Sequence, residues 1–71
     1  MRYLVVYERE GRSFGAHVPD LPGCVAVPTS LPRVKKLIRE AIAMHVEDMV
    51  DRGERLPEPS IEIEYIDAQP A

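Results

Sequence analysis

The sequence has a single cysteine, no excess of basic residues and no long apolar run. One cysteine excludes an internal disulfide, and Cys24 with two distant histidines lacks the spacing of a zinc site. No stretch approaches the roughly 18 apolar residues of a membrane span. The apolar start of the chain is also too short for a signal peptide. We therefore expect a cytoplasmic protein with a reduced thiol, no cofactor and no membrane association.

The net charge of −3 gives no general attraction for nucleic acid, whose binding domains are usually basic. A chain of 71 residues forms one domain with a marginal core. Small domains often gain stability from disulfides, metals or a partner subunit. Since neither of the first two is indicated, we expect self-association, as a homodimer or a homotetramer.

Four segments have the composition of β-strands. They are Tyr3–Glu8, Ser13–Val18, Cys24–Val27 and Ser60–Ile66. The first is rich in β-branched and aromatic residues, and the last alternates strictly between apolar and acidic side chains. Gly11 supplies a turn between the first two, which predicts a hairpin.

A long helix is predicted between the third and fourth strands. Thr29 and Ser30 are both suitable caps, and Pro32 is tolerated in a first turn. Gly53 is a good C-terminal cap, and Pro57 prevents continuation. Apolar positions recur every three or four residues along one face, namely Val34, Leu37, Ile38, Ala41, Ile42, His45, Val46 and Met49.

The order β-β-β-α-β predicts an α+β fold with a four-stranded mixed sheet of order 3-2-1-4. One long helix would cover one face of this sheet, and the crossover to the last strand would be right-handed. The first strand is apolar on both sides, with Tyr3, Val5 and Tyr7 on one. A single helix cannot bury both faces, so we expect the second face or an edge to meet another chain. The alternative is an open face that tolerates a few apolar residues.

The segment between the second and third strands, "VPDLPG", predicts a rigid corner. Pro19 and Pro22 each fix φ near −65° and favour an extended preceding residue. Asp20 can bond to nearby backbone, and Gly23 can adopt a positive φ. The corner is either a purely structural turn or a contact surface that presents Asp20 and Leu21.

The predicted helix carries its charges against the helix dipole. Its first half is basic, with Arg33, Lys35, Lys36 and Arg39, and its end is acidic, with Glu47, Asp48, Asp51 and Glu54. Two such helices could lie antiparallel across a two-fold axis. Alternatively, the charges form a solvated face. Contact with RNA phosphates is a third possibility.

Chemistry at the remaining polar residues is less favoured. A metal-dependent nuclease would need converging carboxylates, and the candidates are Glu8, Glu10, Asp20, Glu40, Glu47, Asp48 and Asp51. His45 follows the apolar helix face, which suggests a core or rim residue. His17 lies on the strand face opposite Phe14 and could titrate near neutral pH. Cys24 is expected to be a small buried thiol.

The stretches "FGAHVPDLPGCVAVPTS" and "IREAIAMHVEDMVDRGERLPEP" resemble the HicB-type antitoxin domain. The matching elements are Val18–Cys24, the polar cap, the helix with Glu40-Ala41-Ile42 and His45, and the exit with Gly53 and Pro57. The resemblance implies a degraded RNase H-like fold over residues 1–66, followed by a short tail at 67–71. It also implies inhibition of a partner toxin, HicA, which cleaves mRNA.

Two departures from the family pattern bear on function. After Ile66 only "DAQPA" follows, so DNA binding through an added C-terminal module is doubtful. The first helical turns are basic, where the family is usually acidic. A solitary member without a toxin is therefore an open alternative.

The favoured hypothesis is a non-catalytic, HicB-like antitoxin that acts by direct contact as a homo-oligomer. The alternatives are a residual metal-dependent RNase H-like nuclease and a small RNA-binding protein. No catalytic or metal-binding residue is predicted. The candidate partner-interface residues are Tyr3, Val5, Tyr7, His17, Asp20, Leu21, Arg33, Lys36, Arg39, Glu47 and Asp51.

Overall fold

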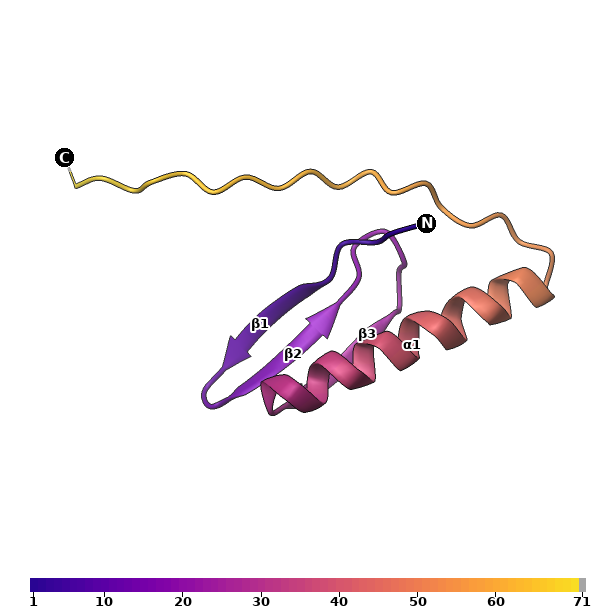
Figure 1. Cartoon of the computed structure of the whole chain (residues 1–71), viewed down its shortest axis with the longest axis horizontal. Helices are drawn as coiled ribbons and strands as arrows, with labels where there is room; N and C mark the ends of the chain where they lie inside the picture. The colour runs from indigo at the N-terminus through magenta and orange to yellow at the C-terminus, as the bar shows by residue number, and fades with distance from the viewer. Residues whose placement is uncertain (71) are drawn as a thin grey trace.

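The computed structural model describes residues 1–70 and contains three strands followed by one helix (Figure 1). The elements are β1 (Val6–Glu10), β2 (Ser13–His17), β3 (Val25–Thr29) and α1 (Leu31–Asp51). The first four elements of the predicted β-β-β-α-β order are therefore observed, although β1 begins at Val6 and not at Tyr3. The helix lies along one face of the sheet, and the chain then continues as an extended C-terminal segment.

The three strands form an antiparallel sheet of order β1-β2-β3, which makes β1 and β3 the edge strands. Val6 pairs with His17 across the first hairpin, whose turn contains Gly11 with a φ of 61°. The pairing of β2 with β3 is irregular between Phe14 and Ala16. Pro28 fits in β3 because an edge strand need not donate all its hydrogen bonds.

The predicted four-stranded mixed sheet of order 3-2-1-4 is wrong. Within residues 1–70 the sheet has three strands, all antiparallel, and Ser60–Ile66 is extended without joining it. The RNase H-like strand order is accordingly not observed. Alternation of apolar and polar side chains indicates a segment suited to a sheet, but it does not place that segment beside an edge. Here the segment diverges from β1 (Figure 1).

The ends of α1 follow the predicted capping residues closely. The Ser30 hydroxyl accepts a hydrogen bond from the Arg33 N–H at 3.3 Å, and Pro32 lies in the first turn. At the other end, Gly53 has a φ of 72°. Its N–H donates to the Val50 carbonyl, and the Glu54 N–H donates to the Met49 carbonyl. This pair of bonds is the Schellman motif, which a glycine at this position favours.

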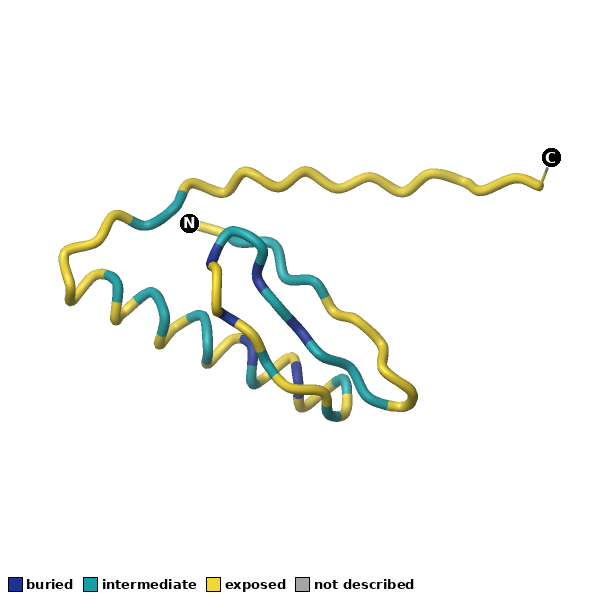
Figure 2. The backbone as a smooth tube through the Cα atoms, turned by 180° about the vertical axis from the view of Figure 1, so that it is seen from behind, coloured by how far each residue is buried: buried dark blue, intermediate teal, exposed yellow. Residues whose placement is uncertain are grey.

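The core is small and lies between the sheet, the corner after β2 and the first half of α1. Figure 2 shows that the buried residues are confined to this region, whereas the C-terminal segment is exposed almost throughout. Additional apolar residues pack around the core with partial exposure, including Phe14 and Ile42. The buried set is Ala16, Val18, Leu21, Cys24, Val34 and Ile38.

The corner between β2 and β3 is closed by its own backbone. The Val18 N–H donates to the Cys24 carbonyl at 3.1 Å, and the Cys24 N–H donates to the Leu21 carbonyl at 3.0 Å. A third bond joins the Leu21 N–H to the Val18 carbonyl at 3.0 Å. Gly23 has a φ of 86°, as predicted for this turn. These bonds direct the Leu21 side chain into the core, where it is fully buried.

Leu21→Ala should lower the free energy of unfolding by about 2–5 kcal/mol, because it leaves a cavity in a core of few residues. Urea denaturation followed by circular dichroism measures the change. Val27→Ala is the control, since Val27 is 72% exposed and its truncation should have little effect. Equal stability of the two variants would contradict the role assigned to Leu21.

Candidate protein-binding surfaces

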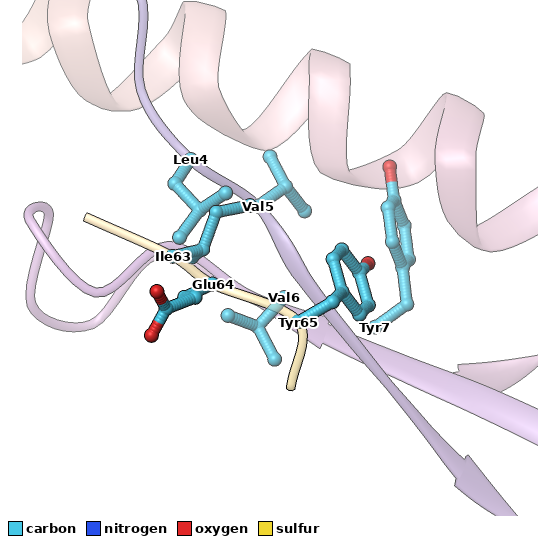
Figure 3. A pocket seen from close by; sticks show the side chains of 7 residues that line it. All are labelled: Leu4, Val5, Val6, Tyr7, Ile63, Glu64 and Tyr65. Carbon is cyan, nitrogen blue, oxygen red and sulfur yellow. The ribbon is translucent and has the colours of Figure 1, made fainter. Parts of the chain in front are cut away.

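The face of the sheet opposite α1 has no cover within the described chain. Register places Val6, His17 and Val25 on this face, and Val25 is 60% exposed. Figure 3 shows Val6 directed away from the helix, whereas Val5 and Tyr7 are directed toward it. The bare face is therefore partly apolar, and it is the first candidate surface for contact with another protein.

A polar pair lies on the same face. His17 Nδ1 is 3.5 Å from Glu8 Oε1, and both side chains are partly exposed. The pair becomes an ion pair when His17 is protonated, although such exposed pairs contribute little to stability. Both residues line a shallow hollow of about 220 Å³ together with Gly15 and Pro28. This cross-strand partner of His17 was not identified from the sequence.

The predicted interface residues of the first strand occupy the helix side of the sheet. Tyr3 and Val5 pack against the core, and the Tyr7 ring lies 6.0 Å from Lys35 Nζ. Leu21 has no exposed surface to offer a partner. The sequence did not single out Leu4 and Val6. When both faces of a strand are apolar, the sequence does not reveal which face the helix covers.

The outward face of α1 carries the reversed charges that the sequence predicts. Its first turn contains no acidic residue, and its last turn contains no basic residue. The basic candidates Arg33, Lys36 and Arg39 are exposed, as are the acidic candidates Glu47 and Asp51. Near the C-terminal end, Arg52 forms ion pairs with Asp48 at 2.8 Å and with Glu54 at 3.2 Å. Pairing of two such helices stays a prediction.

Asp20 holds the beginning of the C-terminal segment. Its carboxylate accepts hydrogen bonds from the Ser60 hydroxyl at 2.7 Å and from the Ser60 N–H at 3.1 Å. Nearby, the Tyr3 hydroxyl donates to the Pro57 carbonyl at 2.6 Å. The corner thus sets the direction in which the following residues leave the domain, a role beyond the local turn bonding expected for Asp20.

Beyond Ser60, the C-terminal segment runs past the start of β1 and leaves a space between them. This cavity has a volume of about 400 Å³ and is lined by residues 4–7 on one side and residues 63–65 on the other (Figure 3). Leu4, Val6 and Ile63 give it an apolar lining. It adjoins the edge of β1 that does not pair with β2.

Cys24 and His45 occupy the positions that the sequence indicates. Cys24 is buried, and this burial raises the pKa of its thiol. His45 is partly buried on α1 and lines a hollow of about 470 Å³ with Cys24 and Asp48. Across residues 1–70, no three His, Cys, Asp or Glu side chains form a group that could hold a metal ion. The same residues include no helix with the length and apolar character needed to cross a membrane.

The bare sheet face, the charged helix and the extended segment are the exposed surfaces that the described residues offer to a partner. The chain belongs to the HicB-like antitoxins: residues 3–71 match the family described as "HicB_like antitoxin of bacterial toxin-antitoxin system". The family resemblance drawn from "VPDLPGC" and the helix is therefore confirmed.

A phage protein is also similar to this chain. It is an uncharacterized 14.9 kDa protein from the rep-hol intergenic region of Haemophilus phage HP1, 32% identical over 66 residues. The match covers 93% of this chain but 50% of the phage protein, so the chain spans about half the length of that relative. No solved structure matches the chain.

Asp20→Ala should release the C-terminal segment. Loss of the two bonds to Ser60 removes on the order of 1 kcal/mol of hydrogen bonding, so trypsin should cleave after the exposed Arg55 about fivefold faster. Mass spectrometry of timed digests measures the rate. Asp67→Ala, which lies beyond the attachment, should cleave like the unsubstituted chain. Indistinguishable rates for the two variants would show that Asp20 does not hold the segment.

Cys24 should react slowly with iodoacetamide in the folded protein. Its thiol is buried and its pKa is raised by that burial, so little of the reactive thiolate forms near neutral pH. The rate should rise strongly in denaturant and should also rise with pH above 9. Alkylation as fast in buffer as in urea would contradict the position of Cys24 in the core.

Proposed function

We propose that this chain is an antitoxin that neutralises a HicA-type, mRNA-cleaving toxin by direct protein contact and that it acts in the cytoplasm as a homo-oligomer. The observation that carries the proposal is the match to the HicB-like antitoxins across residues 3–71. The exposed surfaces described above supply the means of contact. The inhibition is steric, since an occupied RNA-binding surface cannot receive its substrate.

The acidic half of α1 is the surface best suited to such a toxin. An RNA-cleaving protein must attract phosphates, so its substrate surface is basic. Glu47 and Asp51 are exposed and four residues apart, which places both carboxylates on one side of the helix. Asp48 is paired with Arg52, so Glu47 and Asp51 are the stronger candidates for ion pairs with a toxin.

The small core supports the homo-oligomeric part of the proposal. The buried hydrophobic residues of the described chain form one small cluster between the sheet, the corner after β2 and the first half of α1. Val6 and Val25 lie on the other side of the sheet, which nothing in the described chain covers. A second copy would shield such residues and add the stability that a domain of this size lacks.

Co-expression with a HicA-type toxin should restore growth, and the purified chain should block RNA cleavage by that toxin. The double variant Glu47→Lys/Asp51→Lys should weaken toxin binding at least tenfold, which corresponds to about 1.4 kcal/mol. Isothermal calorimetry measures the affinity, and a fluorescent RNA reports cleavage.

The matched control is Glu10→Lys/Asp67→Lys, which makes the same charge change at exposed residues outside the helix. It should bind like the unsubstituted chain. The proposal fails if the chain neither binds nor inhibits the toxin. If both double variants lose affinity equally, the assignment of the contact to α1 is wrong.

A further inference from the structure

The C-terminal segment exposes more apolar surface than a stable single chain would leave in water. Its side chains alternate between apolar and acidic from Ile61 to Tyr65. Ile61 is 43% exposed, Ile63 65%, Tyr65 95% and Ile66 79%. A strand with this pattern is suited to a sheet with one buried face. Within its own chain, however, the segment pairs with none of the described strands.

The overall dimensions also indicate an excess of exposed surface. The solvent-accessible surface is 5976 Å², whereas a compact monomer of 8.0 kDa exposes about 4,450 Å². The radius of gyration is 14.5 Å, against about 11 Å for a compact domain of this length. The surplus of about 1,500 Å² per chain exceeds the roughly 800 Å² that each partner buries in a stable interface. The chain thus has enough exposed surface for a substantial interface.

The free edge of β1 is the complementary feature. Its first residues carry apolar side chains, and its unpaired backbone groups can accept another strand. The cavity of about 400 Å³ lies between residues 4–7 and the chain's own residues 63–65. Asp20 and Tyr3 hold the beginning of the segment, and the segment then diverges from β1 (Figure 1) without pairing with it. The same edge therefore stays open to a segment from elsewhere.

We propose that two chains exchange their C-terminal segments: Ser60–Ile66 of each chain binds beside residues 4–7 of the other and pairs with the free edge of its β1. The apolar side of the segment then packs against side chains of residues 4–7, and Glu62 and Glu64 remain exposed to solvent. The contact is reciprocal, so it closes at a dimer. This inference rests on the self-association proposed above and is independent of the toxin.

Sedimentation equilibrium of the full chain tests the exchange. The unsubstituted chain should be a dimer, and Ile63→Pro should raise its dissociation constant at least about tenfold, because proline removes a backbone donor within the pairing segment. Ile63 is exposed in the single chain, so this variant should still fold. Asp67→Pro, placed after the segment, is the control and should dimerise normally.

Disulfide trapping tests which chain supplies the segment. One preparation carries Leu4→Cys and the other carries Tyr65→Cys, and they are mixed under mild oxidation. A covalent dimer containing one chain of each kind is expected, and the buried Cys24 should not contribute. The unsubstituted chain is the control for stray oxidation.

Several results would overturn the exchange. These are a monomeric unsubstituted chain, a dimer that tolerates Ile63→Pro, and a Leu4→Cys/Tyr65→Cys double variant that forms its disulfide only within single chains. If Ile63→Pro abolishes toxin binding while the free protein is monomeric, the segment binds the toxin instead. That outcome refutes the exchange and leaves the proposed antitoxin function intact. If the chain forms the exchanged dimer but does not bind the toxin, the antitoxin function is refuted and the exchange is supported.

Discussion

One helix covers one face of the sheet, and the rest of the molecule depends on this geometry. Three strands span about 10 Å between the outer two, which is close to the diameter of a helix with its side chains. The first half of α1 therefore seals one face, and the buried residues gather beneath it. Nothing in the described chain covers the opposite face, so Val6 and Val25 remain at the surface.

The corner between β2 and β3 links this core to the C-terminal segment. Its backbone closes on itself from Val18 to Cys24, which commits Leu21 to the core. The same rigid turn presents Asp20 to Ser60. A proline-rich loop that could have been a contact site is thus structural on its inner side. On its outer side it determines where the extended segment begins, and so which surfaces remain free for partners.

The distribution of surface fits a protein that acts by contact. The HicB-like antitoxins are the family to which the chain belongs, and its charged helix offers acidic residues suited to a basic partner. The extended segment and the free edge of β1 offer a second, largely apolar means of association. These two surfaces lie on different elements, so the proposed self-association and the proposed toxin contact use different residues.

Local features were predicted well from the sequence. Ser30, Pro32 and Gly53 marked the ends of the helix because capping depends on residues within one turn. Alternation also placed Phe14 and His17 on opposite faces of β2, because the face on which a strand residue lies depends on its local position in the sequence. The prediction of a fourth strand in the sheet was wrong, because the alternation of Ser60–Ile66 indicates a preference for a sheet and not the position of an edge.

Contacts between residues far apart in the chain could not be predicted from the sequence. The bond between Asp20 and Ser60 joins residues 40 positions apart, and no local pattern relates them. The choice of which side of β1 faces α1 was equally hidden, since both sides are apolar. The sequence by itself determined three strands and a helix in this order, the capping residues at the ends of the helix, and the antitoxin family. Only the tertiary structure decided which edge stays free and where the C-terminal segment points, because pairing depends on the relative positions of elements and not on the propensity of any one of them.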